Sequence, residues 1–192
     1  MEKRIEVETI TIRHLVNQKK RIVLTGPEST AKSTLSKLLA AHYGGLAYPE
    51  FARDYLCGKT SHYEYSDVEA IAHGQLSQYR DSLEKQSNYF FFDTWLIVTK
   101  IWFRWVYKQE PDWLEPAIVN HPMDLYLLCK PDIPWEPDPL RENGGEQREK
   151  LFHIYRNELV KRAFPFVEIG GEGEVRLQNA IDAIDDFNFS RL

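Results

Sequence analysis

Apolar and polar positions change in blocks from residue 20 to the C-terminus, and each block has the period of a strand or of a helix. Short continuous apolar runs predict buried strands, whereas apolar residues three or four positions apart predict amphipathic helices. Because the two kinds of block follow one another in turn, the pattern predicts an α/β domain with a parallel, five-stranded sheet between two layers of helices. The predicted strands are 21–25, 46–49, 89–93, 125–129 and 166–169.

The predicted helices fill the segments between these strands. The first runs from Ser33 to Tyr43 and is stopped by Gly44 and Gly45. A short helix covers 51–56, and Ser66 is expected to cap a long helix that follows it. Further helices are predicted over 94–108, from about residue 146, and over 175–187. Residues 1–20 form a charged N-terminal arm of undecided structure, so the expected domain is 21–192.

The segment between the first strand and the first helix matches a phosphate-binding loop at every key position except one. Such a loop directs backbone N–H groups at the phosphates of a nucleotide. Lys32 is expected to reach the β- and γ-phosphate oxygens, and the Ser33 hydroxyl to ligate Mg²⁺. The loop predicts that the protein binds ATP through Gly26, Pro27, Glu28, Ser29, Thr30, Ala31, Lys32, Ser33 and Thr34.

The exception is Ala31, because the motif has glycine at this position. A side chain there costs about 1–2 kcal/mol if the residue needs a left-handed conformation. We interpret Ala31 as a tolerated variant because Lys32, Ser33 and both flanking elements are intact. The alternative is an unrelated strand, turn and helix with a capping lysine.

Two carboxylates follow predicted strands, where functional groups of open α/β sheets gather. Asp93 ends the strand 89–93 and is a candidate to bind Mg²⁺ or to accept a proton from the substrate; alternatively, it caps the next helix. Glu50 ends the strand 46–49 and is a candidate to face an acceptor hydroxyl. Arg53 lies three residues later, so the two could instead form a solvated ion pair.

Four prolines within residues 131–139 exclude a helix or a central strand, and the loop that they stiffen leads to Gly144 and Gly145. Arg141 and Arg148 flank these glycines, where a mobile lid would place cations over the transferred phosphoryl group. Trp135 lies within the loop and could stack on a ring of the substrate. The tryptophans and other aromatic residues of 94–108 are more typical of a core.

Composition narrows the class of protein. The 192 residues suit one domain, and a net charge of −5 argues against a general nucleic-acid binder. The two cysteines predict no disulfide scaffold or zinc site, and the histidines have no metal-ligand spacing. No apolar run has the length of a membrane span or the form of a signal peptide, so a cytoplasmic location is expected. The oligomeric state stays open.

The chain resembles the ribosylnicotinamide kinase domain of NadR-like proteins, a branch of the P-loop NTPases. The matching segments are GPESTAKSTL (26–35), PEFARDYL (49–56), FFDTWLIVTKIW (91–102) and YLLCKPDIPWEPDPLREN (126–143). This resemblance implies the three-layer P-loop fold with a lid segment, and ATP-dependent phosphorylation of the 5′-hydroxyl of nicotinamide riboside. It also implies that residues 26–34 hold the ATP phosphates, that Asp93 is the metal or base carboxylate, and that 170–175 lie where related kinases hold adenine.

The chain also departs from this family. Besides Ala31, it has Trp95 where the family often has a second carboxylate. Too few residues precede 21 for the adenylyltransferase domain of bifunctional relatives, so that second activity is not expected. Two alternatives remain: a kinase for another nucleoside, and a nucleotide-binding regulatory ATPase that acts on a protein partner. An empty pocket beside Asp93 and Glu50 would favour a kinase, whereas a cleft filled by Trp95 or Trp135 would favour the regulator.

Overall fold

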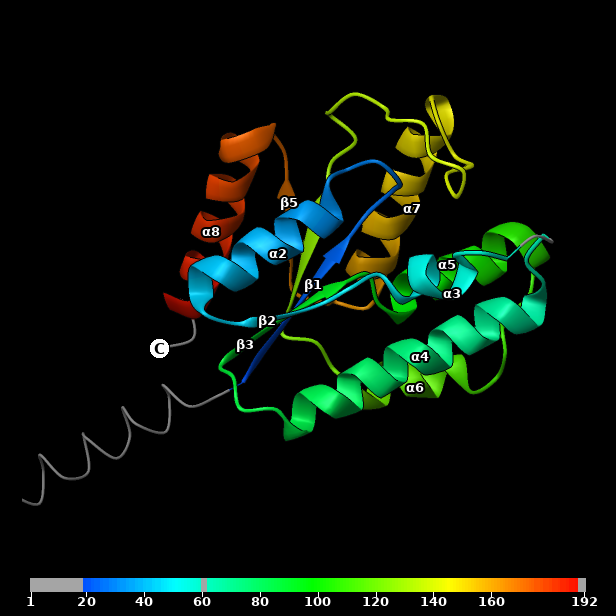
Figure 1. The fold of residues 1–192 in the computed structure, drawn as a ribbon, viewed down its shortest axis with the longest axis horizontal. Coiled ribbons are helices and arrows are strands. Elements are labelled where there is room, and N and C mark those ends of the chain that lie inside the picture. Colours follow the sequence, from blue (N-terminus) through cyan, green and yellow to red (C-terminus); the bar gives the residue numbers. More distant parts are fainter. Residues whose placement is uncertain (1–18, 60–61, 190–192) are drawn as a thin grey trace, which may run out of the picture.

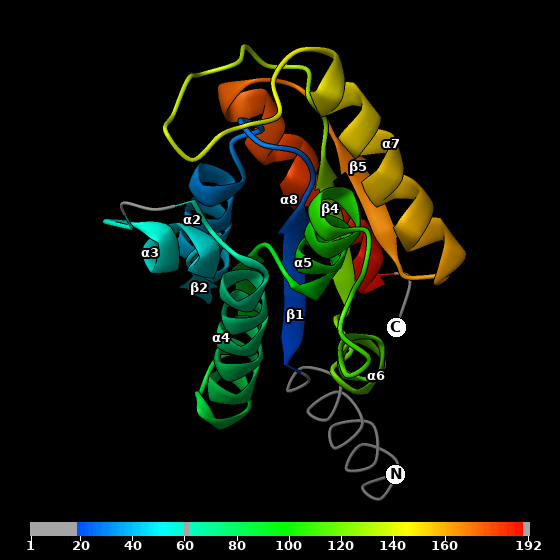
Figure 2. The ribbon, with the colours of Figure 1, turned by 90° about the vertical axis from the view of Figure 1, so that its right-hand side faces the viewer.

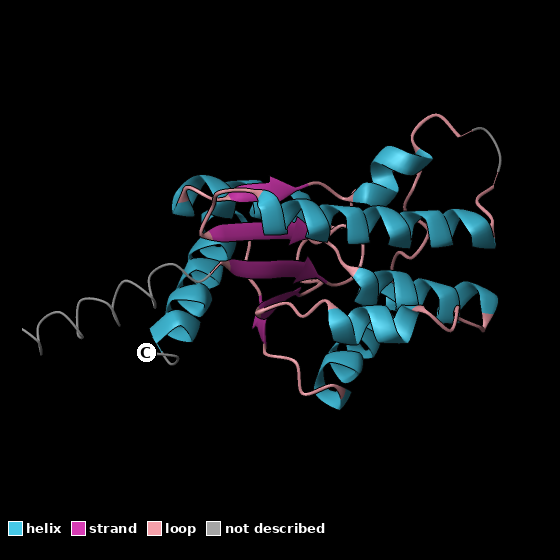
Figure 3. Ribbon diagram, turned by 90° about the horizontal axis from the view of Figure 1, so that it is seen from below, coloured by secondary structure: helices cyan, strands magenta, loops and turns pink. Residues whose placement is uncertain are grey.

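Five parallel strands form the centre of the structure, a computed structural model that describes residues 19–59 and 62–189 (Figures 1 and 3). Their order across the sheet is β2-β3-β1-β4-β5, and every neighbouring pair is parallel. This confirms the predicted sheet. The strands are β1 (Lys20–Thr25), β2 (Leu46–Tyr48), β3 (Tyr89–Asp93), β4 (Leu125–Cys129) and β5 (Phe166–Ile169).

Helices cover both faces of the sheet and make it the middle of three layers (Figure 1). Two of them, α2 (Lys32–Tyr43) and α8 (Gly173–Phe189), pack on one face over Ile22 and Leu24 of β1. The opposite face, with Val23, lies against the second group of helices. That group consists of α4 (Tyr65–Glu84), α5 (Leu96–Trp102), α6 (Leu114–Asn120) and α7 (Glu146–Lys161).

The central strands are apolar along their whole length because both of their faces are covered. All five residues of β4 are buried, including Cys129, which confirms that its thiol is a core group. The edge strand β2 instead exposes Leu46. In the central strands, therefore, only the residues at the strand ends can face a ligand.

The structure corrects three sequence predictions. The helix α4 is capped by Glu64, in a capping box with Asp67, so Ser66 lies inside the helix and does not cap it. The predicted helix 94–108 starts only at Leu96 and continues after α5 as the π-helix η1 (Phe103–Tyr107). The helix α6 was not predicted: Leu114, Ala117 and Ile118 have helical spacing, but its seven residues include a proline and are too few to show a repeated helical period.

Two segments complete the edge at which the strands end. The short helix α3 (Phe51–Leu56) follows β2, and residues 130–145 arch from β4 to α7 above the start of α2 (Figure 2). Within the described ranges, no helix has the length and apolarity needed to cross a membrane. The expected N-terminal arm lies outside these ranges except for Lys19 and Lys20, and Lys20 already belongs to β1.

Candidate active site

A cavity of about 390 Å³ lies at the carboxyl ends of the strands, where open α/β sheets bind their ligands. One wall is the phosphate loop and the start of α2, and segment 130–145 covers it. The other walls come from α3, α4, α5 and η1. Neither Trp95 nor Trp135 lines this cavity, so neither tryptophan fills the space beside Glu50.

The phosphate loop has the backbone that its sequence requires, despite Ala31. Ala31 adopts the left-handed conformation, with φ 60° and ψ 23°, immediately before α2 begins. Gly26 has φ 127°, and a Cβ there would lie 2.6 Å from the carbonyl oxygen of Cys129. The loop thus keeps glycine at the position where a side chain would collide, and it tolerates alanine at the position where the cost is only about 1–2 kcal/mol.

Lys32 and Thr30 close the loop on itself. The Lys32 ammonium donates to the carbonyl oxygen of Pro27 at 2.7 Å, and the Thr30 hydroxyl donates to the same oxygen at 2.9 Å. Lys32 lines the cavity, so its charge is available to an anion placed there. Carbonyl oxygens of Ser29 and Thr30 accept bonds from the buried guanidinium groups of Arg148 and Arg176, and these bonds hold the loop from behind.

Asp93 lies beside the phosphate loop because β3 pairs with β1, which places it next to Leu24. Both of its carboxylate oxygens are buried without a hydrogen-bond partner among the described residues, as is the hydroxyl of Thr25. Burial raises the pKa of Asp93, and the nearby Lys32 ammonium and Ser33 hydroxyl oppose that rise. Unpaired buried oxygens are costly unless a ligand satisfies them.

These oxygens fit a hard cation, because Mg²⁺ binds carboxylate and hydroxyl oxygens and takes its other ligands from water and phosphate. Ser33 and Asp93 are the residues that would hold it. No cluster of three or more histidine, cysteine or acidic side chains forms a metal site elsewhere in the described part of the chain.

Glu50 is the N-cap residue of α3 and lines the same cavity as Lys32. About 30% of the Glu50 side chain is exposed, and this residue lines the cavity. Burial of the rest raises the pKa of Glu50, the Lys32 ammonium opposes that rise, and the Asp93 carboxylate adds to it. Arg53 lies 3.8 Å from Glu50 and donates to Asp138 of segment 130–145 at 2.9 Å. The predicted pair therefore exists, and its arginine also joins α3 to the covering segment.

Segment 130–145 is fastened to the phosphate loop by the loop's own side chains. Glu28 accepts bonds from the backbone N–H groups of Glu142 and Asn143, both at 2.9 Å. The Ser29 hydroxyl accepts from the backbone N–H of Glu136 at 3.0 Å. Arg141 lines the cavity and bonds to the Ser29 hydroxyl at 3.4 Å. The segment thus covers the loop as a lid would, with a cation inside the cavity.

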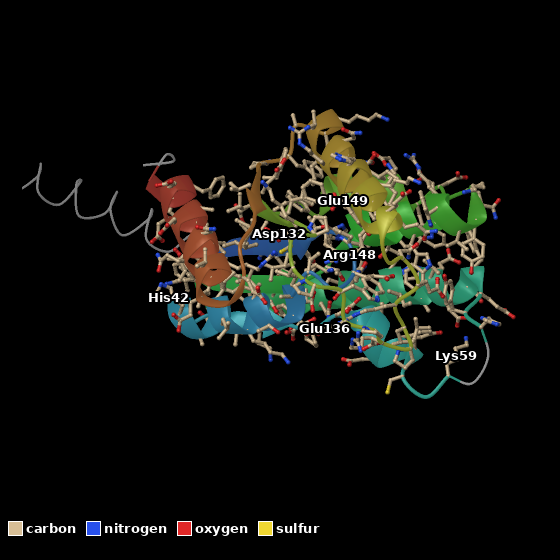
Figure 4. The ribbon with its side chains drawn as sticks, turned by 90° about the horizontal axis from the view of Figure 1, so that it is seen from above. His42, Lys59, Asp132, Glu136, Arg148 and Glu149 are labelled. Carbon is tan, nitrogen blue, oxygen red and sulfur yellow. The ribbon has the colours of Figure 1, made fainter. Side chains whose placement is uncertain are left out.

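Arg148 and Trp135 occupy a different place from Arg141. Arg148 is buried on α7, donates to the carbonyl oxygens of Ser29 and Ile133, and lies over the ring of Trp135 at 5.6 Å. Neither residue lines the cavity. In Figure 4, Arg148 lies near the centre of the view with Asp132 and Glu136. His42 and Lys59, which do not line the cavity, lie farther out in the same view. Contacts of Arg148 with phosphate and of Trp135 with substrate stay predictions.

The segment expected to hold adenine follows β5 and is held by a residue that sequence reasoning missed. Arg176 is buried in the first turn of α8 and donates to the carbonyl oxygens of Gly171, at 2.7 Å, and Thr30, at 3.2 Å. It also bonds to Asp132, whose other oxygen accepts from the N–H of Gly171. No local signal marks this arginine, because its partners are far apart in the sequence.

The half of the cavity away from the phosphate loop has polar and aromatic parts that sequence reasoning also missed. Next to Asp93, it is lined by Gln75, Thr94 and Thr99. Farther along α5 and η1, Trp102 and Trp105 line it together with Tyr63. Gln75 had a detectable signal, since it is a polar residue on the otherwise apolar stripe of α4 between Ile71 and Tyr79.

Thr94 has the most unusual backbone in this half of the cavity. Its φ is 71°, which is rare for a β-branched residue. Such a conformation costs of order 1–3 kcal/mol and persists only where surrounding contacts impose it. It lets the chain turn sharply from β3 towards α5 while the N–H of Thr94 stays bonded to Leu24 at 3.0 Å.

Comparisons with known proteins agree with this geometry. The chain is 31% identical over 145 residues to the trifunctional NAD biosynthesis/regulator protein NadR of Salmonella typhimurium, a match that covers 73% of this chain and 35% of that protein. A crystal structure of NadR protein in complex with NR has a TM-score of 0.77 at 22% identity, covering 91% of this chain and 53% of the other. A second, in complex with NAD and AMP-PNP, has a TM-score of 0.70 at 20% identity, covering 88% and 49%.

The chain therefore spans about a third of the NadR relative and about half of each NadR chain in the crystal structures. The crystal structures confirm the P-loop fold that the sequence predicts. The family model described as an AAA domain matches residues 21–176, which include the phosphate loop, Asp93 and the covering segment. The chain belongs to the AAA domain family, as a P-loop domain similar to that of NadR.

Proposed function

We propose that the protein is an ATP-dependent kinase that phosphorylates the 5′-hydroxyl of nicotinamide riboside and gives nicotinamide mononucleotide. The observation that carries this proposal is the open cavity, which joins an ATP-type phosphate loop to a second compartment with Glu50 and aromatic walls. A pure nucleotide-binding regulator needs no such compartment. The similarity to a NAD biosynthesis protein supports the acceptor, and one NadR structure contains the ATP analogue AMP-PNP.

In this mechanism, the two halves of the cavity hold the two substrates. Residues 26–34 hold the ATP phosphates, with Lys32 at the β- and γ-phosphate oxygens. The 5′-hydroxyl oxygen attacks the γ-phosphorus, the bond from that phosphorus to the bridging oxygen breaks, and ADP leaves. The hydroxyl proton passes to Asp93 or Glu50. Carboxylates whose pKa values are raised by partial or full burial suit this role.

Charge on the moving phosphoryl group needs neutralisation throughout the transfer. Lys32 and Arg141 supply two cations that line the cavity. Mg²⁺, held by Ser33 and Asp93, would add charge compensation at the ATP phosphates when bound. We expect Arg148 to act through the carbonyl oxygen of Ser29, because its guanidinium is occupied there.

The aromatic compartment suits a flat, positively charged ring such as that of nicotinamide riboside. Trp102 and Tyr63 meet edge to face, with ring centroids 4.8 Å apart, and the Tyr63 hydroxyl donates to Glu142 at 3.0 Å. A cation over an aromatic face gains about 0.5–2 kcal/mol, and the adjacent carboxylate adds to that attraction. Fewer than two helical turns separate Trp105 from Thr99, so the ring and the sugar can be bound side by side along one wall.

The decisive experiment measures ADP release with and without nicotinamide riboside, in the presence of Mg²⁺, and identifies the product by mass. We expect riboside-dependent ADP and one equivalent of nicotinamide mononucleotide. Turnover with adenosine or uridine but not with nicotinamide riboside would assign the kinase to another nucleoside. ATP binding without turnover on any nucleoside would contradict the kinase and favour the regulatory ATPase. The reaction is expected in the cytoplasm.

A further inference from the structure

A buried amide connects α4 to the turn that follows Asp93. Gln75 is 2% exposed, and its Nε2 donates to the Thr94 hydroxyl at 3.4 Å. Its Oε1 accepts from the Thr99 hydroxyl at 2.6 Å. In this arrangement the Thr99 hydroxyl occupies the oxygen of the amide, and the nitrogen of the amide points towards Thr94.

Thr94, which accepts the bond from Gln75, has a strained backbone directly after Asp93. Thr94 has φ 71° and follows directly after Asp93, whose carboxylate has no hydrogen-bond partner of its own. The Ser33 hydroxyl and the Lys32 ammonium lie near that carboxylate, and the backbone on either side of Asp93 decides where it lies relative to them. On the N-terminal side that backbone is fixed by pairing with β1. On the C-terminal side it is fixed by the conformation of Thr94.

We propose that Gln75 is a positioning residue for phosphoryl transfer: through Thr94 it holds the turn after Asp93 in the left-handed conformation and so fixes where the Asp93 carboxylate lies. The three side chains Gln75, Thr94 and Thr99, which we call the amide clamp, come from two helices and the turn between β3 and α5. This inference rests on the proposed kinase function for its kinetic readout. It does not require that Gln75 contact the substrate.

A double-mutant cycle tests the amide clamp, because glycine adopts a positive φ without support. The variants are Gln75→Leu, Thr94→Gly and the two together, and Gln147→Leu is a matched control at an exposed position of α7. We measure kcat and the KM values for ATP and for nicotinamide riboside, together with the melting temperature. If Gln75→Leu does not fold, Thr99→Val takes its place in the same cycle.

We expect Gln75→Leu to lower kcat by about 10-fold to 100-fold when residue 94 is threonine, because small displacements of reacting groups have effects of that size. With glycine at residue 94, the same substitution should lower kcat by less than about threefold. Both KM values should change less than kcat. An equal loss of kcat in both backgrounds, or a loss confined to the KM for the riboside, would overturn the proposal, since Gln75 would then act on the substrate directly.

The melting temperature tests the amide clamp without depending on the proposed kinase activity. If the unaltered protein has no riboside-dependent turnover, the proposed function fails, and the thermal cycle alone decides on the amide clamp. Gln75→Leu should then lower the melting temperature by about 2–4 °C more with threonine at residue 94 than with glycine. Equal thermal losses in the two backgrounds would overturn the amide clamp whatever the reaction is.

Discussion

The two halves of the cavity are built in different ways. The phosphate half comes mainly from one continuous segment, residues 26–34, and its groups are set by the path of the backbone. The acceptor half is assembled from three separate parts of the chain: α3, α4, and α5 with η1. Variants of the phosphate half should therefore affect every reaction that uses ATP. Variants of the acceptor half should instead change which nucleoside is used.

The largest expected effect is at the boundary between the halves. Asp93→Asn should lower kcat by about 10²–10⁴-fold, because an amide cannot take the hydroxyl proton. ATP binding, measured by calorimetry in the absence of the acceptor, should remain. Glu50→Gln is the matched comparison, with the same loss of charge at a carboxylate that lines the cavity. If Asp93→Asn keeps its turnover and Glu50→Gln loses it, the base is Glu50.

Lys32→Ala tests the phosphate half alone. We expect kcat to fall by about 10²–10³-fold for any acceptor, because the variant lacks a cation at the phosphoryl group. The melting temperature should change little, since Lys32 bonds only to a carbonyl oxygen of its own loop. The control is Lys85→Ala, at an exposed lysine outside the cavity. Unchanged turnover in Lys32→Ala would contradict the phosphate-loop assignment.

Trp102→Leu tests the acceptor half alone. Stacking of a base on an aromatic ring contributes about 1–3 kcal/mol, so the KM for nicotinamide riboside should rise about 10-fold to 100-fold. The KM for ATP should stay the same, and Trp102→Phe should keep most of the affinity for the riboside. Should both KM values rise together in Trp102→Leu, the two halves would not be separable in the way that the cavity lining suggests.

The smallest effect is expected at Ala31, and it concerns stability. Ala31→Gly removes a left-handed cost of about 1–2 kcal/mol but gives up about 0.5–1 kcal/mol through the greater freedom of glycine when unfolded. The free energy of unfolding, from urea titration, should therefore rise by about 0–1.5 kcal/mol. ATP binding should be preserved or improved. Weaker ATP binding would mean that the methyl group of Ala31 packs specifically against the bound nucleotide.

The phosphate half and the acceptor half of the cavity also differ in how much of each could be predicted from the sequence. The phosphate loop, Asp93 and Glu50 were found from strand ends and a local motif. In the structure the loop and Glu50 line one cavity, and Asp93 is buried beside the loop, next to the cavity-lining Thr94. The covering segment was located from its prolines and glycines. Its attachment to Glu28 and Ser29 was not foreseen, since hydrogen bonds to a loop more than 100 residues away leave no local pattern.

The acceptor half was largely missed for a physical reason. Trp102 and Trp105 have the spacing of core residues, and only the packing of neighbouring helices decides that they also line a cavity. Trp95, which belongs to the same aromatic run, is fully buried. The π-helix after Trp102 and the positive φ of Thr94 are likewise conformations that tertiary contacts impose and that residue preferences argue against.

The sequence by itself determined the parallel sheet, the two helical layers and the phosphate loop, because these depend on hydrophobic period and on backbone preferences within a few residues. Tertiary structure alone decided which buried polar groups meet, such as Gln75 with Thr94 and Thr99, and Arg176 with Thr30. The free energy of such contacts depends on distances between segments far apart in the chain. No local pattern encodes those distances before the protein folds.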